Sequence, residues 1–328
     1  MRLAALAVIT TAAALVALSA PRAQPEAPKL GFPVACRIGR TCEIQHYVDR
    51  DPGPGALDYR CGHRTYDKHD GVDIRLLDMV AQRAGVDVVA AAAGRVVAVR
   101  DGVPDISIRA PGAPSVAGHE CGNRVGVSLG GGWIIDYCHL AKGSLKVKVG
   151  DTVAAGQPLA QVGLSGDTEF PHLHFSVRHA NVLVDPFSAV PGGCGAAAPL
   201  WTPAAAAEMG YKRGAVLNAG FSTAAVSMAA MDERAAPAPT AAAPAIVVYA
   251  RLIGLEAGDI IDLTLLGPDG KALAAGTLPP LDHDKDQVPA EILGKRPPQG
   301  WAHGAYSAVL RVRRSGAVAL THHWNTTL

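Results

Sequence analysis

Four histidines of this 328-residue chain are concentrated in three short segments that lie far apart in the sequence. The segments read His-Asp-Gly-Val-Asp at 69–73, Tyr-Cys-His-Leu at 137–140 and Pro-His-Leu-His-Phe at 171–175. Neutral imidazole and carboxylate are ligands that zinc accepts, and a catalytic zinc site combines three protein ligands with an open position. A fold that brings the three segments together would therefore hold ligands for one ion and a free base beside it.

The first and third segments have the residue pattern of β-strands. β-branched or aromatic residues alternate there with polar ones, at Val72, Ile74, Phe175 and Val177. Side chains two apart on a strand point to the same face, so we expect His172 and His174 to share one face while Leu173 turns toward a core. His69 and Asp73 lie four apart, and a turn at the intervening glycine would let both reach the same ion.

A histidine pair on a strand has an ordinary interpretation too, as two solvated or hydrogen-bonded side chains. Three such segments in hydrophobic strand context favour the metal site instead. The sequence contains no His-Glu-x-x-His motif and no Gly-x-Ser-x-Gly motif, so a zinc peptidase with a glutamate base and a serine hydrolase are both disfavoured. Four further histidines have no partner at ligand spacing and are interpreted as surface or structural residues: His46, His63, His119 and His179. Of these, His63 or His119 could line the cleft.

The three segments resemble the three signatures of the lysostaphin-type (LytM-like) zinc metallopeptidases, which cut peptide bonds in cell-wall peptidoglycan. Residues 147–159 are similar to the V-x-x-G-x-x-V-x-x-G-Q run of that family, and residues 90–99 resemble its A-x-x-x-G-x-V strand. The resemblance covers residues 60–187, roughly two-fifths of the chain. One departure is the segment Asp-Thr-Glu-Phe at 167–170, where the family has Ser-Thr-Gly. This change affects the lip of the cleft and bears on substrate preference more than on metal binding.

The resemblance implies the role of each candidate residue. His69, Asp73 and His174 would be the ligands of Zn²⁺, and His139 and His172 would be the catalytic histidines. A histidine with an ordinary pKa of about 6.5 can take the proton of a water molecule or hydrogen-bond a developing oxyanion. The implied substrates and partners are peptidoglycan peptides.

The amino terminus predicts export. Met1 and Arg2 precede an apolar, alanine-rich run over 3–18, and small residues follow. This is the pattern of a secretory signal peptide, which we place at 1–23. A retained membrane anchor is the alternative, but spanning takes about 20 apolar residues. We therefore expect a periplasmic or secreted protein with no membrane span in the mature chain.

Six cysteines in an exported chain imply disulfides, and six allow fifteen pairings. Residues 125–129 and 133–137 flank three glycines and predict a hairpin. If Ser128 faces Gly131, the same ladder sets Cys121 opposite Cys138, so we expect a Cys121–Cys138 bridge. Cys36 and Cys42 are close enough in sequence to close a local loop. The remaining pair is Cys61–Cys194.

The rest of the chain predicts an all-β protein with two domains. Residues 33–190 contain short strands separated by Gly or Pro turns, with one brief helical turn within 75–84. After a Pro/Gly-rich exit at 186–199, candidate strands fall at 214–222, 246–253, 260–266, 305–312 and 317–324. We expect a LytM-like antiparallel sheet domain at 24–195 and a small immunoglobulin-like β-sandwich at 200–328. The sandwich holds no predicted catalytic residue, so it would position the enzyme or cover part of its cleft.

The net charge of +1 provides no basic field for nucleic acid. We expect a monomeric zinc endopeptidase acting on peptidoglycan. Two other classes stay open: a non-catalytic regulator or activator of other wall hydrolases, and an adhesion or carbohydrate-binding protein centred on the sandwich. Such regulators typically lack one or more metal ligands, and the presence of all five key residues favours the enzyme.

Overall fold

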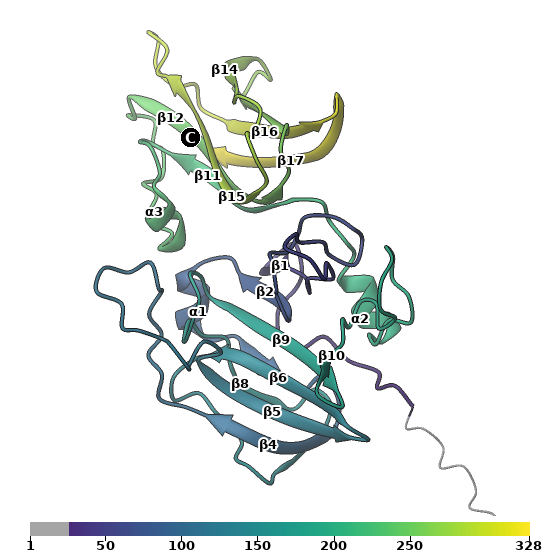
Figure 1. Cartoon of the computed structure of the whole chain (residues 1–328). Coiled ribbons are helices and arrows are strands. Elements are labelled where there is room, and N and C mark those ends of the chain that lie inside the picture. Colours follow the sequence, from purple (N-terminus) through teal and green to yellow (C-terminus); the bar gives the residue numbers. More distant parts are fainter. Residues whose placement is uncertain (1–25) are drawn as a thin grey trace, which may run out of the picture.

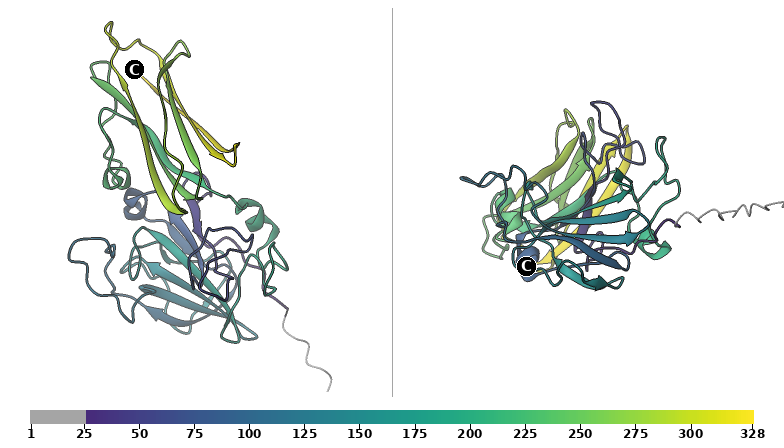
Figure 2. Two further views of the ribbon diagram at one scale, coloured as in Figure 1. Left: turned by 45° about the horizontal axis from the view of Figure 1, so that its top comes forward. Right: turned by 60° about the horizontal axis from the view of Figure 1, so that its bottom comes forward.

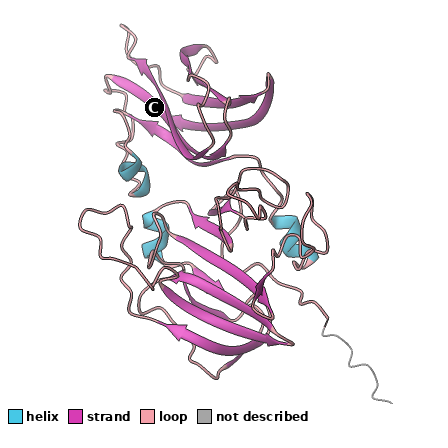
Figure 3. Cartoon of the chain, in the orientation of Figure 1, coloured by secondary structure: helices cyan, strands magenta, loops and turns pink. Residues whose placement is uncertain are grey.

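The computed structural model describes residues 26–328 and is built almost entirely from strands. Two sheet-rich domains lie one above the other (Figures 1 and 2), and the helices in the described part are short (Figure 3): Met79–Ala84 (α1), Pro203–Glu208 (α2) and Met228–Asp232 (α3). The all-β prediction is confirmed. The predicted signal peptide lies outside the described residues. Between residues 26 and 328 no helix has the length and apolar character needed to cross a membrane.

The main sheet of the first domain is antiparallel and places the three histidine segments on neighbouring strands. Its central strands are β2, β9 and β6, in that order, with β9 in the middle. The full order runs from Cys42–His46 (β1) to Val72–Leu76 (β2), His172–His179 (β9), Trp133–Leu140 (β6), Asn123–Gly130 (β5), Gly94–Arg100 (β4) and Thr152–Val153 (β7). Val182–Leu183 (β10) pairs with β9, and Asp87–Val89 (β3) pairs with Pro158–Gln161 (β8).

Alternation along β9 separates the core face from the site face, as predicted. Leu173 and Phe175 are fully buried in the first hydrophobic core, where Val72 and Ile74 of β2 join them. His172 and His174 share the opposite face. Burial of the apolar face therefore fixes the register that directs both histidines to the same side.

The hairpin of β5 and β6 and all three disulfides are confirmed, but the predicted register is wrong by three residues. Ser128 pairs with Ile134 rather than with Gly131, and Val125 pairs with Tyr137. The turn is formed by Gly131 and Gly132, both with positive φ, and lies two residues further along the chain than expected. The ladder is shifted again before Val125. The ladder therefore does not pair Cys121 with Cys138; instead the chain before β5 lies beside β6, where the His139 amide donates to the Cys121 carbonyl at 2.9 Å. The observed bridges are the expected ones: Cys121–Cys138, Cys36–Cys42 and Cys61–Cys194.

Two sheets of the C-terminal domain enclose a second core. One sheet contains Ala215–Ser222 (β11), Ala245–Leu255 (β12) and Lys285–Lys295 (β15). The other contains Ala272–Thr277 (β14), Ile260–Leu266 (β13), Ala305–Arg314 (β16) and Ala317–Thr327 (β17). Buried residues of both sheets form one cluster, so the domain is a β-sandwich. All five predicted strands are present, whereas β14 and β15 were not predicted.

The expected helical turn is shorter than residues 75–84, and the first core extends beyond residue 195. Arg75 belongs to β2, and α1 begins only after Asp78, whose side chain accepts from the Ala81 amide. Leu200 and Trp201 are buried in the first core, and α2 adds Ala205 to it. The segment that follows the last cysteine therefore packs on the first domain.

The sandwich is docked on β1 and β2 through two fully buried arginines. Arg75 donates to the Gln287 side chain of β15 at 3.3 and 3.4 Å. Arg251 of β12 donates to the Leu77 carbonyl at 2.8 Å and to Asp232 at 2.6 Å. Burial, together with the neighbouring Arg251 charge, lowers the pKa of Arg75 to about 9. The contact places the beginning of β15 beside the histidine-bearing strands.

Candidate metal centre

His69, Asp73 and His174 converge on one point. Asp73 of β2 and His174 of β9 face each other in the ladder, and His69 reaches back from the loop before β2. The Asp73 Oδ1 atom lies 3.2 Å from His69 Nε2 and 3.0 Å from His174 Nδ1. The two nitrogens are 3.3 Å apart. The three side chains are buried or nearly so, and together they form a group that could hold a metal ion.

The spacing of these atoms fits a small tetrahedral ion. Zinc binds imidazole nitrogen and carboxylate oxygen at about 2.0–2.1 Å, which puts neighbouring ligand atoms of a tetrahedron about 3.3 Å apart. The three observed separations lie between 3.0 and 3.3 Å. Imidazole and carboxylate are also the ligand types that suit zinc. The donor set therefore fits the metal in both chemistry and size.

Hydrogen bonds behind the rings fix which nitrogen faces the shared point. His69 Nδ1 donates to the Tyr47 carbonyl at 2.7 Å, which leaves Nε2 as the free atom. His174 Nε2 lies 3.2 Å from Asp70 Oδ1, which leaves Nδ1 free. Arg178 holds the other oxygen of Asp70 at 2.6 Å. Such outer partners orient the ring and increase its basicity toward a metal.

The electrostatics of the group favour a positive charge at its centre. Burial alone would raise the pKa of the Asp73 carboxyl, but His69 and His172 outweigh it and hold that pKa well below its usual value. Burial would lower the pKa of His174, whereas Asp70 and Asp73 raise it to about 9. The carboxylates thus attract a cation to the same atoms that a metal would use, and a proton on His174 would compete with that metal.

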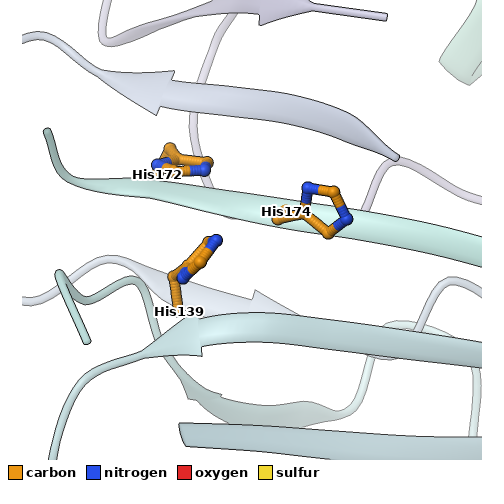
Figure 4. Close-up of side chains that lie close together, drawn as sticks. All are labelled: His139, His172 and His174. Atoms are coloured by element: carbon orange, nitrogen blue, oxygen red, sulfur yellow. The ribbon is translucent and has the colours of Figure 1, made fainter. Parts of the chain in front are cut away.

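His139 and His172 lie beside this group and point into the same space (Figure 4). Each is anchored at Nδ1, His139 by the Ser165 carbonyl at 2.8 Å and His172 by the Phe170 carbonyl at 3.0 Å. Both therefore present Nε2. Burial, with the nearby His172 and His174 rings, lowers the pKa of His139 well below its usual value, so His139 is neutral at pH 7.

The backbone at His139 is locally strained. Its φ is +59°, a left-handed conformation that residues other than glycine adopt uncommonly, with asparagine, aspartate and histidine enriched among those that do. The irregular pairing of β5 and β6 occurs at the same end of the hairpin. Strain of this kind clusters at functional sites. Here it accompanies an imidazole directed toward the other histidines (Figure 4).

The structure therefore brings all five predicted site residues together. His139, His172 and His174 also form a group that could hold a metal, with ligand atoms within 4.8 Å of one another. In the first group the donor atoms lie at most 3.3 Å apart. His172 Nε2 lies 3.4 Å from Asp73 Oδ1, at the edge of that first group. The first group is the ligand set that the family resemblance implied.

A cavity of about 290 Å³ opens beside His139 and His172. All four residues of the unusual 167–170 segment line it, together with Asp73 and Arg75 of β2. Asp286 and Gln287 of the sandwich form part of its wall. The cavity is therefore bounded by both domains, and the segment that departs from the family pattern lies at its edge, as expected.

Gly71 allows His174 to lie close to the backbone. A Cβ atom at this position would lie 2.4 Å from His174 Nε2, far inside any allowed contact. Any larger residue would therefore displace the imidazole from its place beside Asp73. The glycine serves a close approach of a ring to the main chain rather than a left-handed turn.

His46, expected to be a surface or structural residue, is buried and contacts a candidate metal ligand, which the sequence did not reveal. It is 6% exposed, and its Nδ1 lies 3.0 Å from Asp73 Oδ2. His46 has no second ligand-type residue at a suitable spacing in the sequence. Its position in a partly apolar strand segment was the one weak signal that it is buried. His63 and His119 line other surface pockets and not the cavity beside His139 and His172.

The comparisons agree with the predicted resemblance. A profile of Peptidase family M23 matches residues 67–186, which contain all five predicted site residues. This segment is a Peptidase family M23 domain. Over 87 residues, 26% of its length, the chain is 37% identical to the cell division protein DipM of Caulobacter vibrioides. It spans only 14% of the length of DipM.

Solved structures similar to the M23 domain include two proteins named as peptidases or M23 proteins. The catalytic domain of the prophage-encoded M23 protein EnpA from Enterococcus faecalis is 23% identical, with 48% of this chain and 98% of that chain covered and a TM-score of 0.33. The catalytic domain of the antimicrobial peptidase lysostaphin from Staphylococcus simulans is 24% identical, with 43% and 85% covered and a TM-score of 0.28.

Proposed function

We propose that this chain is an exported, monomeric zinc metalloendopeptidase that hydrolyses peptide bonds in the cross-links or stem peptides of peptidoglycan. The observation that carries the proposal is the convergence of His69, Asp73 and His174 within 3.0–3.3 Å of one another, beside two further imidazoles. We assign the three residues as Zn²⁺ ligands and His139 and His172 as the catalytic histidines. Membership of a peptidase family supports the assignment.

Zinc held by these ligands would supply Lewis acidity toward the scissile carbonyl and lower the pKa of a water molecule. The chain itself supplies the proton transfers. His139 is neutral, and its free Nε2 can accept a proton from the attacking water. Whichever of His139 and His172 takes this proton becomes an imidazolium, which can hydrogen-bond the developing oxyanion and then donate the same proton to the leaving amine. The carbonyl groups behind both rings hold these nitrogens toward the cavity.

We further propose that the sandwich is an accessory domain and that the division between the domains falls near residue 212. Leu200, Trp201 and Met209 are buried in the core of the M23 domain, so a fragment ending at residue 195 would lose part of that core. The sandwich begins with β11 at Ala215. The candidate metal ligands and catalytic histidines all lie before this division.

A non-catalytic regulator of other wall hydrolases is the second candidate. The partial match to DipM, which is named a cell division protein, raises it. The enzyme is favoured because the metal ligands are complete and because His139 and His172 are held in working orientations. The two candidates make opposite predictions about purified protein acting alone.

The test uses the chain without its predicted leader, added to purified peptidoglycan sacculi. We expect soluble fragments to be released without any other protein, because the site holds both the metal ligands and the proton-transfer groups. A strong chelator should stop the release, and stoichiometric zinc should restore it. Release that continues unchanged in the chelated, zinc-free protein would reject the zinc mechanism. Failure of the zinc-loaded protein to release any fragment would favour the regulator.

A further inference from the structure

A chain of hydrogen bonds runs from the candidate metal centre into the C-terminal domain. His46, at the end of β1, is hydrogen-bonded at both ring nitrogens. Its Nδ1 lies 3.0 Å from Asp73 Oδ2, and its Nε2 lies 3.1 Å from Asp286 Oδ1. Asp286 belongs to β15 of the sandwich, so the three residues link the two domains.

The link determines which oxygen of Asp73 faces the other ligands. His46 occupies Oδ2, and Oδ1 is the atom within 3.0–3.2 Å of His69 and His174. The terminal torsion of an aspartate is broad, so a free carboxylate can rotate. A hydrogen bond from a buried ring to one oxygen removes that freedom. Partners of this kind behind metal ligands typically change metal affinity ~10–100-fold when they are removed.

Contacts from both domains fix the segment that carries Asp286. Gln45 Nε2 donates to the Asp286 carbonyl at 2.8 Å, and Arg75 donates to the side chain of the adjacent Gln287. On the other side, β15 pairs with β12 through Gln287 and Ile253. The Asp286 side chain itself is 69% exposed, and its one side-chain hydrogen bond within residues 26–328 is with His46.

We propose that Asp286 is a positioning residue of the M23 site: it holds His46 in the orientation that directs Asp73 toward the metal. The inference rests on the proposed zinc site and assigns the C-terminal domain a part in it. The sandwich then does more than cover the cleft, because docking completes the hydrogen bonds behind a metal ligand.

The test is the zinc dissociation constant of the full chain, measured by competition with a chromophoric chelator. His46→Leu should weaken zinc binding ~10–100-fold. Asp286→Asn should weaken it less, by up to ~10-fold, because Asp286 acts at one further remove and is open to solvent. If Asp286 acts through His46, adding Asp286→Asn to the His46→Leu variant should weaken zinc binding no further, since the two residues belong to one network.

Asp282→Asn is the matched control. It removes the same charge from the same exposed segment, where Asp282 contacts Lys285 and His283 but not His46. Zinc affinity should be unchanged in this variant, and circular dichroism should show that every variant is folded. An Asp286→Asn variant with wild-type affinity would overturn the inference. An equal loss in both backgrounds would also overturn it, because the effect would then bypass His46.

The outcome also separates this inference from the proposed function. A wild-type chain that binds zinc, and loses it on Asp73→Ala, while tolerating Asp286→Asn contradicts only the role of Asp286. A wild-type chain that binds no zinc contradicts both.

Discussion

Asp73→Ala is expected to reduce bound zinc from about one ion per chain to nearly none and to abolish peptidoglycan hydrolysis. Asp73 contributes the oxygen that lies within 3.0–3.2 Å of both ligand imidazoles, and its carboxylate supplies charge to a buried site. His174→Ala should behave in the same way. Metal content is measured on the purified variants by atomic emission or mass spectrometry after dialysis against metal-free buffer.

Asp67→Ala is the matched control for this prediction. Asp67 lies two residues before His69, but its side chain is exposed and forms an ion pair with Lys68. That variant should keep its zinc and its activity. The ligand assignment is wrong if Asp73→Ala and His174→Ala both remain fully loaded with zinc while folded.

His139→Asn and His172→Ala should retain zinc and lose activity by ~10²–10⁴-fold each, the usual contribution of a positioned acid or base. Both rings present Nε2 to the cavity and lie outside the group of His69, Asp73 and His174. Asparagine is chosen at position 139 because the φ of +59° suits it better than alanine. The measurements are zinc content and the rate of fragment release from sacculi.

The control for the second prediction is His179→Ala, which removes another imidazole from β9. His179 packs on Trp133 at the far end of the strand and contacts the Gly131 carbonyl. Its removal should leave zinc content and rate near wild type. Loss of zinc in His139→Asn would show that the second group of donor atoms, rather than the first, holds the metal.

The strands that carry the site could be predicted from the sequence because one face of each is apolar and the other is polar. Leu173 and Phe175 must be buried, so His172 and His174 had to share the other face. The same alternation predicted most strands of the sandwich. The weaker pattern of β14 and β15 gave no such signal, since β14 is rich in Ala and Gly and β15 carries a proline and several charges.

The outer part of the site could not be predicted from local patterns. His46 and Asp286 are 240 residues apart, and only the docking of the two domains brings them together. The register of the β5–β6 hairpin was missed because it depends on which glycines form the turn. The bridge between Cys121 and Cys138 was nevertheless predicted correctly, although the ladder does not pair these two residues: the segment before β5 lies beside β6 and brings the cysteines together.

The most direct test of the central proposal is mass spectrometry of the muropeptides left after purified, zinc-loaded protein has acted on sacculi. Hydrolysis of a peptide bond adds one water and creates a new amino terminus. The account predicts such termini in stem or cross-link peptides, with intact glycan strands, and none with the Asp73→Ala variant. Muropeptides identical to those of untreated sacculi, or cleavage confined to the glycan, would contradict it.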